Sequence, residues 1–394
     1  MGKIAKKGNK ALFEVVDRIK ELLRVDPLHD IYSRINEAVL SENLSEILDK
    51  YTDIIKADPE RDWIQNMFMF SGADSAGLGQ DYTPAALSKI MAGVSDYEDA
   101  ETVLDVCCGT GSLTLQLHKK HHGLHFTMQE CDARVVSLLL FNMALNNVYA
   151  DILHMDIITG QIFAIYEVRP GERFGAVEKL PGTDYEVKKY DIVIANPPFN
   201  MKIHAIHTAL INRETTDGNT FFIDYCMQHM KKSGRGGVIM MNSILCKDGD
   251  INDVRKALIE QKLLSGAMNF TTNLFESTSI GTCLLCIGEA DRPLLIDCTE
   301  KKTGAGKKWT YSKEQIEEIL SIFRHREAGN VRTFDEVTPG EYLALIPDAE
   351  ELKSRAYAID ATRYLSCGCV TKEDLKEVVN DYMQWKFMQA FQRR

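Results

Sequence analysis

The sequence has no long hydrophobic run and no sign of export. No apolar stretch approaches the roughly 20 residues that a membrane-spanning helix needs, and the lysine-bearing N-terminus is too polar for a signal peptide. The ten cysteines are scattered, several of them inside apolar runs. Without an export signal, this usage favours reduced thiols in a cytoplasm over a disulfide framework. We therefore expect a cytoplasmic chain that does not enter a membrane.

The sequence also lacks the residues of several common reaction types. It has no P-loop lysine, no cluster of metal ligands and no Ser-His-Asp order, so phosphoryl transfer, metallohydrolysis and acyl transfer are unsupported. Cys283 and Cys286 have C-x-x-C spacing, but they lie in a continuous apolar run. A zinc site would need further ligands at close spacing, which neither this pair nor Cys367-Gly-Cys369 has. No bound metal is expected.

Positive charge is in short supply, because the formal net charge is −11. An acidic chain contacts nucleic acid through local basic patches or through a basic partner. The candidate patches are the lysines of residues 3–10, the segment 231–235 and the segment 301–308. Each patch, taken alone, is more simply explained as a solvated loop.

What is present fits a globular chain with more than one domain. The 394 residues are enough for two or three domains, and 45% hydrophobic with 26% charged residues is ordinary for a packed core. Apolar residues at three- and four-residue spacing predict helices over residues 11–23, 31–40 and 45–55. We expect a helical N-terminal domain over residues 1–75, an α/β domain over 76–290 and a C-terminal extension over 291–394.

The middle of the chain alternates between strand and helix patterns, which is typical of a doubly wound α/β sheet. Strands are predicted at 102–107, 125–129, 152–155, 192–195, 238–241, 265–270 and 282–287. Helices are predicted at 113–120, 132–147, 220–232 and 252–262, and in the extension at 312–325, 348–355 and 371–392. Residues 159–189 are interpreted as an excursion, 200–219 as a polar loop and 234–237 as a turn.

A glycine turn follows the first of these strands. Gly109 and Gly111 lie in Cys108-Gly-Thr-Gly-Ser112, where the absence of a side chain lets the backbone approach a ligand closely. The spacing is not G-x-G-x-x-G, which makes a dinucleotide pyrophosphate less suitable. Glu130 ends the second strand, about 20 residues further on, where a carboxylate can accept both hydroxyls of a ribose. Asp156 is a third acidic strand end. Upstream, Thr83-Pro84 is expected to open a helix as its N-cap and first residue.

The segment Asp191 to Asn200 reads D-I-V-I-A-N-P-P-F-N. The apolar run predicts a strand buried on both faces, and Pro197 and Pro198 end it because neither can donate to a sheet ladder. Asn196 is then held on an extended strand end beside the Pro197 carbonyl and Phe199. An amide, fixed carbonyls and an aromatic ring suit a planar group that carries an NH2. The simpler interpretation is a strand that ends in a proline turn.

These strand ends together favour methyl transfer. The glycine turn, Glu130 and Asp156 would hold a nucleoside on one side of the crevice, and Asn196 to Phe199 would hold a planar amine on the other. Transfer from S-adenosylmethionine needs such a pocket and an aligned acceptor but little acid–base help. Catalysis then rests mainly on positioning, which contributes roughly 7 to 11 kcal/mol in aligned reactions.

The same motifs resemble those of the modification subunits of type I restriction-modification systems, over about residues 10–290. Asn196-Pro197-Pro198-Phe199 stands where the family has its catalytic tetrapeptide. The resemblance implies a Rossmann-like methyltransferase sheet, mostly parallel with its last strand antiparallel, after an all-helical N-terminal domain. It also implies that contacts to S-adenosylmethionine come from Gln80, Tyr82, Thr83, Pro84, Asp105, Cys107, Gly109, Thr110, Gly111, Glu130, Cys131, Asp156, Ile157 and Asn196. Asp81, Val106 and Ser112 depart from the family's motifs.

By this resemblance the substrate is the exocyclic amine of an adenine flipped out of double-stranded DNA. The chain is short for the family and has no evident target-recognition domain, so a separate specificity subunit, and with it a restriction subunit, are expected partners. Other functions with the same tetrapeptide are methylation of guanine amines in RNA or of a glutamine amide in proteins. A methyltransferase-like subunit that binds without turnover is a further alternative.

Overall fold

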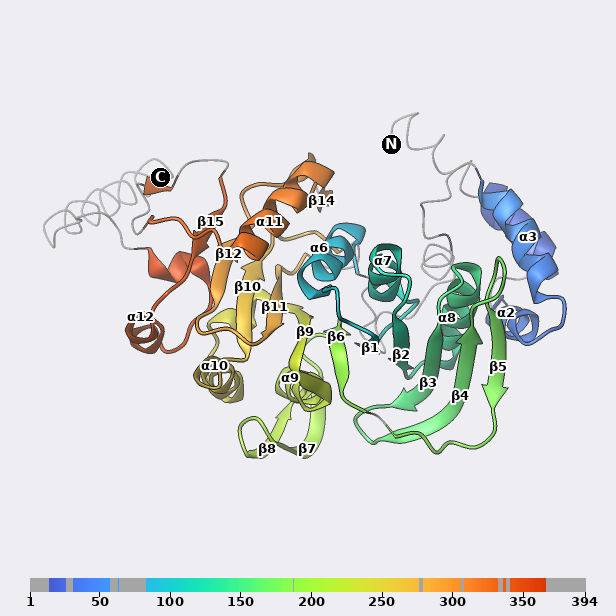
Figure 1. The fold of residues 1–394 in the computed structure, drawn as a ribbon, viewed down its shortest axis with the longest axis horizontal. Helices are drawn as coiled ribbons and strands as arrows, with labels where there is room; N and C mark the ends of the chain where they lie inside the picture. The colour runs from blue at the N-terminus through green and yellow to red at the C-terminus, as the bar shows by residue number, and fades with distance from the viewer. Residues whose placement is uncertain are drawn as a thin grey trace, which may run out of the picture.

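The fold is organised around one large twisted sheet. The computed structural model describes residues 14–25, 31–56, 63, 83–186, 188–275, 279–305, 308–331, 336–337 and 341–365. The sheet has eleven strands in the order β15-β12-β10-β11-β9-β6-β1-β2-β3-β4-β5 (Figure 1). Within the described residues, no helix is long and apolar enough to cross a membrane.

The centre of the sheet is parallel and contains the predicted strands. It is formed by β9 (Met230–Met241), β6 (Tyr190–Ala195), β1 (Thr102–Val106), β2 (His125–Glu130) and β3 (Ala150–Asp156). Beyond β9, the strand β11 (Thr282–Gly288) runs antiparallel and β10 (Leu264–Asn269) follows it. The α/β fold class with a mixed, mostly parallel sheet is confirmed.

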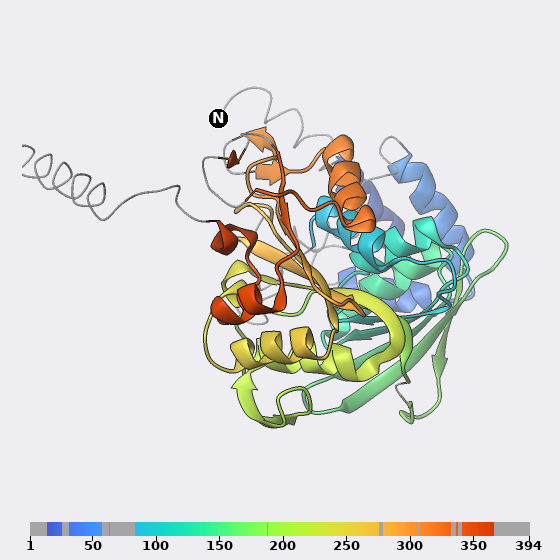
Figure 2. The same ribbon diagram turned by 60° about the vertical axis from the view of Figure 1, so that its left-hand side comes forward.

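Helices cover both faces of the sheet (Figures 1 and 2). One face carries α6 (Ala85–Ser95), α7 (Ser112–Lys120), α8 (Ala133–Leu145) and α11 (Lys313–His325). The other carries α9 (Gly218–His229), α10 (Asp250–Glu260), α12 (Ala349–Ser354) and the 3-10 helices η2 (Asn242–Leu245) and η4 (Ala361–Tyr364). Successive residues of β1 alternate between the two cores, with Val103 in one and Leu104 in the other. The central strands are therefore buried on both faces, which explains their continuous apolar runs.

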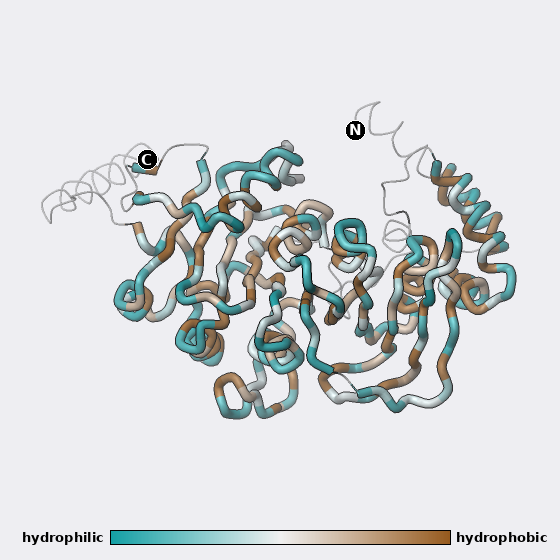
Figure 3. The backbone as a smooth tube through the Cα atoms, viewed as in Figure 1, coloured by the Kyte–Doolittle hydropathy of each residue, from teal (hydrophilic) through white to brown (hydrophobic). Residues whose placement is uncertain are grey.

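The described N-terminal residues are helical, as the periodicity predicts. Residues 14–23 are helical, and α2 (Ile31–Val39) and α3 (Leu44–Ile55) follow. Hydrophobic and hydrophilic residues alternate along α3 (Figure 3), and its Tyr51 packs edge-on against Phe141 of α8 with 5.0 Å between the ring centroids. These helices share one core with the sheet. The rest of the predicted domain 1–75, except Trp63 and the short segments 24–25, 40–43 and 56, lies outside the described residues.

Two segments without predicted structure form hairpins. Residues 159–189 contain β4 (Gln161–Arg169) and β5 (Ala176–Leu180), which extend the sheet beyond β3 by antiparallel pairing. The expected polar loop at 200–219 is wrong, because β7 (Lys202–Thr208) and β8 (Arg213–Asp217) form a separate hairpin there. Ile203 and Ile206 of β7 pack on the core beside α9. Two apolar residues in a polar stretch were too weak a signal for a strand.

The predicted turn at 234–237 is also wrong, because these residues continue β9. A Cβ atom at Gly236 would lie 1.8 Å from the Val193 carbonyl oxygen of β6, and one at Gly237 would lie 2.6 Å from Met91 Sδ of α6. The glycines therefore serve close packing of strand and helix rather than a reversal of the chain.

The sheet continues beyond residue 290. Strands β12 (Leu294–Asp297) and β15 (Leu343–Leu345), which the sequence did not reveal, pair next to β10, and β13 (Thr303–Ala305) and β14 (Lys308–Thr310) form a small hairpin. The helices expected at 312–325 and 348–355 are present as α11 and α12. The helix predicted at 371–392 lies outside the described residues. The domain boundaries at 75 and 290 remain predictions.

A buried carboxylate fastens β6 to the start of β1. Asp191 Oδ2 accepts hydrogen bonds from the Thr102 hydroxyl at 2.7 Å and the Thr102 amide at 3.1 Å, and Lys231 Nζ of β9 donates to Oδ1 at 2.8 Å. Burial alone would raise the pKa of Asp191, but the bonds to Lys231 and Thr102 outweigh it and lower the pKa to about 2. This carboxylate thus joins three central strands.

The Asp191 contacts predict a stability that depends on pH. Because the folded-state pKa of about 2 lies below the ordinary value of 3.8, the stabilisation is complete above pH 4 and is lost as the pH falls towards 2. Asp191→Asn should lower the free energy of unfolding by about 2 kcal/mol at pH 7. Urea unfolding measured between pH 7 and pH 3 checks this, with exposed Asp184→Asn as control. An equal effect of both substitutions at every pH would contradict the assignment.

Candidate active site

The candidate site lies where the chain connections leave the sheet in opposite directions. From β1 the chain continues to β2 on one side, whereas β6 pairs with β1 on the other. Val106 is paired with Ala195, so Cys107 and Asn196 follow at the same edge. A crevice at this position is the usual ligand site of an open α/β sheet. A cavity of about 400 Å³ opens there, lined by residues of the glycine turn, the β2 and β3 ends and the tetrapeptide.

The glycine turn adopts a left-handed backbone that exposes it to the cavity. Cys107 and Gly109 have φ angles of +57°, and that of Gly111 is +88°. A Cβ atom at Gly109 would meet nothing within 4 Å, so this residue faces open space, while one at Gly111 would lie 2.5 Å from Met143 Cε of α8. Gly109 thus leaves room for a ligand, and Gly111 lets α8 pack against the turn.

Glu130 connects this turn to the end of β2. Its Oε2 accepts a bond from the Gly109 amide at 3.1 Å, and its Oε1 accepts from the amides of Cys131 and Asp132, both at 2.9 Å. Burial raises the pKa of Glu130, and the three amide donors oppose that rise. A carboxylate has about four acceptor positions, so about one position of Glu130 remains unused. Glu130 could therefore accept both hydroxyls of a ribose only if one of the three bonds from the backbone amides were broken.

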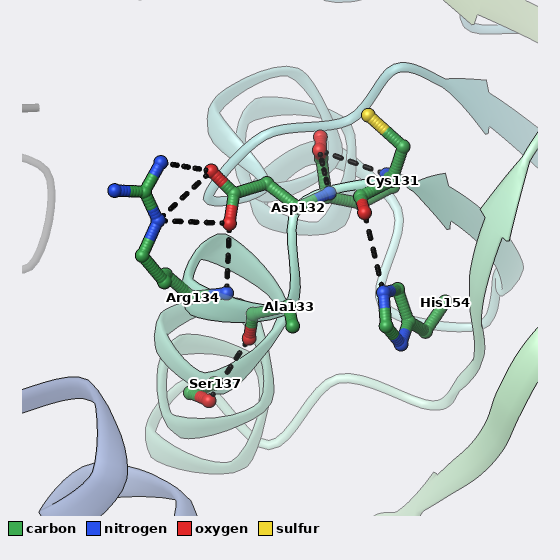
Figure 4. Close-up of polar contacts among 7 residues, drawn as sticks. Cys131, Asp132, Ala133, Arg134, Ser137 and His154 are labelled. Atoms are coloured by element: carbon green, nitrogen blue, oxygen red, sulfur yellow. Dashed lines mark hydrogen bonds and ion pairs between the residues drawn. The ribbon is translucent and has the colours of Figure 1, made fainter. Parts of the chain in front are cut away.

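The residues after Glu130 are held by a second set of bonds (Figure 4). Asp132 caps α8 by accepting from the Arg134 amide at 2.9 Å, and its carboxylate pairs with the Arg134 guanidinium at 2.7 Å. A ring nitrogen of His154 in β3 lies 3.2 Å from the Cys131 carbonyl oxygen. These bonds connect the end of β2 to the start of α8 and to β3.

Asp105 supports the turn from below and does not line the cavity. Its side chain is fully buried in β1, where Oδ2 accepts from the Thr114 hydroxyl of α7 at 2.7 Å. Burial raises the pKa of this carboxyl to about 7. Burial also raises the pKa of the thiols of Cys107, Cys108 and Cys131, which keeps them neutral.

The wall beyond Glu130 is largely apolar. Met155, Ile157, Phe163 and Val135 line it, and Phe163 of β4 is 45% exposed although it is a large aromatic residue. Gln129 lies beside them, fully buried, with its Nε2 donating to the Tyr225 hydroxyl at 2.9 Å. Its Oε1 has no partner among the described residues. The wall thus combines a surface for a flat ring with an acceptor for a polar hydrogen.

Asn196 is oriented by Thr83, two residues before the start of α6. Its Nδ2 donates to Thr83 Oγ1 at 2.9 Å, and both residues line the cavity. The expectation that Thr83 is the N-cap is wrong: the helix begins at Ala85, and Pro84 is the N-cap without a side-chain bond. The Thr83 hydroxyl bonds to Asn196 and makes no capping bond to α6. Because Nδ2 is turned towards Thr83, the Asn196 oxygen is at the opposite end of the amide.

Phe199 is held by an aromatic neighbour that the sequence did not suggest. Its ring packs edge-on against Phe275, with 5.7 Å between centroids and an interplanar angle of 81°. Phe275 is buried and follows β10, so the far side of the sheet supports the tetrapeptide. Phe199 also lines the cavity, so the contact with Phe275 holds its ring at the cavity wall.

Most of the predicted site residues meet at this cavity. Those that line it are Thr83, Cys107, Gly109, Thr110, Glu130, Cys131, Asp156, Ile157, Asn196, Pro197, Pro198 and Phe199. Pro84, Asp105 and Gly111 do not line it, and Gln80 and Tyr82 lie outside the described residues. The lining residues that sequence reasoning missed are Cys108, Ser112, Gln129, Val135, Met155, Ile158, Phe163, Met201 and Phe222. Cys108, Ser112 and Gln129 adjoin predicted residues, whereas Phe163 required recognition of the β4 strand.

The sheet, its helices and this crevice define an α/β fold of the S-adenosylmethionine-dependent methyltransferase class. A methyltransferase subunit of a type I restriction-modification system from Streptococcus thermophilus shares the fold, with a TM-score of 0.61, 17% identity and coverage of 90% of this chain and 80% of that one. The crystal structure of the EcoKI M protein matches with a TM-score of 0.52, 13% identity and coverage of 96% and 89%.

Residues 63–373 match the family described as N-6 DNA methylase, and the chain belongs to this family. The type I restriction enzyme MpnII methylase subunit of Mycoplasma pneumoniae is 22% identical over 366 residues, covering 84% of this chain and 63% of that protein. The EcoKI methylase subunit of Escherichia coli is 20% identical over 326 residues, covering 73% and 58%. The chain thus matches less than two thirds of the length of these two relatives.

Membership of this family implies S-adenosylmethionine as cofactor, and the cavity residues fit it. Gly109 leaves open space beside the turn, and Gln129 Oε1 is a buried acceptor without a partner among the described residues. Glu130 has an acceptor position left for a hydroxyl, and Phe163 with Ile157 offers apolar surface for a purine ring. Thr83 and Asn196 would lie at the opposite end, beside the reacting group.

The role of Glu130 can be tested by Glu130→Gln. The amide presents one acceptor oxygen where the carboxylate has two, so it cannot hold the Gly109, Cys131 and Asp132 amides and a ligand hydroxyl together. A charged hydrogen bond contributes about 1.5 to 3 kcal/mol, so cofactor affinity should fall roughly 10- to 150-fold. Calorimetric titration with S-adenosylmethionine measures this, with Glu178→Gln on the exposed hairpin as control. Unchanged affinity would remove Glu130 from the cofactor site.

Proposed function

We propose that this chain is an adenine-specific DNA methyltransferase, which transfers a methyl group from S-adenosylmethionine to the exocyclic amine of an adenine. The observation that carries the proposal is the position of Asn196, which follows β6 directly beside the glycine turn and lines the same cavity. An amine held by Asn196 would therefore lie next to a cofactor held by the turn. Membership of the N-6 DNA methylase family supports this choice of acceptor.

Asn196 and the Pro197 carbonyl would prepare the amine for attack. An amine on an aromatic base is a poor nucleophile because its lone pair is delocalised into the ring. If Asn196 Oδ1 and the Pro197 carbonyl oxygen accept its hydrogens, they favour a pyramidal nitrogen and the positive charge that develops on it. The bond from Asn196 Nδ2 to Thr83 Oγ1 supports this role, because it turns the amide oxygen away from Thr83. The bound cofactor supplies a methyl group already activated on a sulfonium.

Phe199 would bind the face of the adenine. An adenine in a duplex reaches such a cavity only after it has flipped out, at a cost of a few kcal/mol. Stacking on an aromatic side chain returns roughly 1 to 3 kcal/mol per base. The edge-on contact with Phe275 supports this role because it fixes the ring plane of Phe199.

We further propose that the chain acts on double-stranded DNA in the cytoplasm and that a separate specificity subunit selects the target sequence. A restriction subunit would belong to the same assembly. The relatives named above are methylase subunits of type I restriction enzymes, which supports such an assembly. The described cysteines are free thiols, which supports a reducing compartment. Methylation of RNA or protein and a non-catalytic role are the outcomes against which the proposal is tested.

Expression in a host without DNA methylation tests the proposed function. The chain is expressed alone and with its neighbouring genes, and single-molecule sequencing then detects N6-methyladenine in the host DNA. Asn196→Ala should abolish the modification while cofactor affinity stays within a few fold, because the amide acts on the acceptor. Modified adenines in the Asn196→Ala strain would contradict the catalytic role. Unmodified DNA with every partner, despite cofactor binding, would favour the non-catalytic alternative.

The Thr83 contact leads to a second test on the same reaction. Thr83→Val keeps the shape of the side chain but removes the hydroxyl that accepts from Asn196 Nδ2, so this bond no longer orients the Asn196 amide. A hydrogen bond of about 1 to 2 kcal/mol corresponds to a 5- to 30-fold loss of kcat. The Kd for S-adenosylmethionine should change less than twofold, and Thr83→Ser should restore kcat. A loss confined to cofactor affinity would instead make Thr83 a cofactor contact.

A further inference from the structure

A second concave surface lies on the outer side of α6, away from the sheet. It has a volume of about 330 Å³ and is bounded by α6, α7, α11 and the end of β14. Figure 1 shows α6 between α7 and α11 on this face of the molecule. Lys89 of α6, Lys120 of α7 and Lys313 of α11 line it, together with Ala85 and Glu317. We call this surface the lysine groove.

The three lysines of the groove have little direct pairing with the described acidic side chains. None of them forms a hydrogen bond or a close ion pair with a described side chain. A backbone hydrogen bond lowers the pKa of Glu314, the charge of the neighbouring Lys313 lowers it further, and Glu317 is the one carboxylate in the lining. Three lysines of the predicted basic patches are paired instead. Lys231 pairs with Asp191, Lys301 pairs with Glu318, and Lys302 donates to Thr271 at 3.1 Å. In a chain of net charge −11, the groove therefore concentrates positive charge that the sequence pattern does not reveal.

Helix stability does not account for this arrangement. Lys120 lies in the last turn of α7, where the helix dipole favours a positive charge, so the dipole alone accounts for this lysine. Lys313 lies in the first turn of α11, where a positive charge opposes the dipole, and Lys89 lies in the middle of α6. Three helices thus place like charges around one groove, where a bound anion would reduce their mutual repulsion.

The groove adjoins the candidate active site. Thr83, which bonds to Asn196, lines the catalytic cavity, and Ala85, two residues later, lines the groove. Successive Cα atoms are about 3.8 Å apart, so the two surfaces approach within about 8 Å along the chain. Thr310 bounds the groove on its other side. The amide of the adjacent Trp309 donates a hydrogen bond to the carbonyl of Asn273, two residues before Phe275. The groove is therefore connected along the chain to Thr83 on one side and to the segment of Phe275 on the other.

We propose that the lysine groove binds backbone phosphates of the DNA strand that flanks the flipped base. Lysine ammonium groups are compact cations that contact phosphate oxygens without reading sequence. The groove would thus hold the duplex near the active site, while the choice of sequence belongs to another subunit. This inference rests on the proposed function for the identity of the polyanion, but binding can be measured without turnover.

The test compares K89Q/K120Q/K313Q with wild type in binding a fluorescent duplex of arbitrary sequence, at 50 to 200 mM salt, by anisotropy. Each phosphate contact contributes about 0.9 to the slope of log K against log salt. The triple variant should therefore show a slope shallower by about 2 to 3, and affinity at 50 mM salt should fall more than about tenfold. The triple Lys→Arg variant should keep the wild-type slope, because the charge remains.

The matched control is K188Q/K256Q/K353Q, which removes the same charge from exposed lysines elsewhere. Equal losses in both triple variants would overturn the inference, because net charge alone would explain them. An unchanged slope in the groove variant, or no salt-dependent duplex binding by wild type, would overturn it as well. Preference for a single-stranded RNA of equal length would replace DNA as the ligand. The proposed function fails separately, if wild type binds DNA through the groove yet methylates none.

Discussion

The parallel pairing of β1 with β6 is the contact on which the rest of the site depends. The register sets Val106 opposite Ala195, so the cofactor turn and the acceptor tetrapeptide begin at the same level of the sheet. A slip by one residue would exchange the two faces of β6 and bury Asn196 away from the cavity. Asp191 fixes this register at the other end by bonding to Thr102 and Lys231. The active site is thus aligned by bonds at the opposite edge of the sheet.

The two halves of the crevice are held in different ways. The cofactor half is fixed by backbone amides that converge on Glu130, so its shape depends on one carboxylate. The acceptor half is fixed by contacts between side chains, from Thr83 to Asn196 and from Phe275 to Phe199. Preorganisation of this kind is what methyl transfer requires, because positioned groups need not be reorganised during the reaction.

The sequence predicts the elements that have a strong local pattern and misses those that depend on distant partners. Buried central strands and amphipathic helices are recognisable from periodicity, and the tetrapeptide and glycine turn from their residues. Strands β12 and β15 are short and pair only with segments far along the chain. Phe163 and Phe275 were missed for the same reason, since their positions depend on β4 and on the end of β10. The lysine groove joins helices that lie far apart in the sequence, with Lys89 on α6 and Lys313 on α11.

The glycines of β9 affect how mutational data on this protein should be interpreted. A side chain at Gly236 would overlap the Val193 carbonyl, and one at Gly237 would push α6 away from the sheet. Because α6 begins next to Thr83, such displacement would move the partner of Asn196. In a saturation screen, both glycines would therefore score as inactive as the tetrapeptide, although neither lines the cavity. Loss of function at these positions reports on the spacing of the layers, and only binding measurements separate it from loss of chemistry.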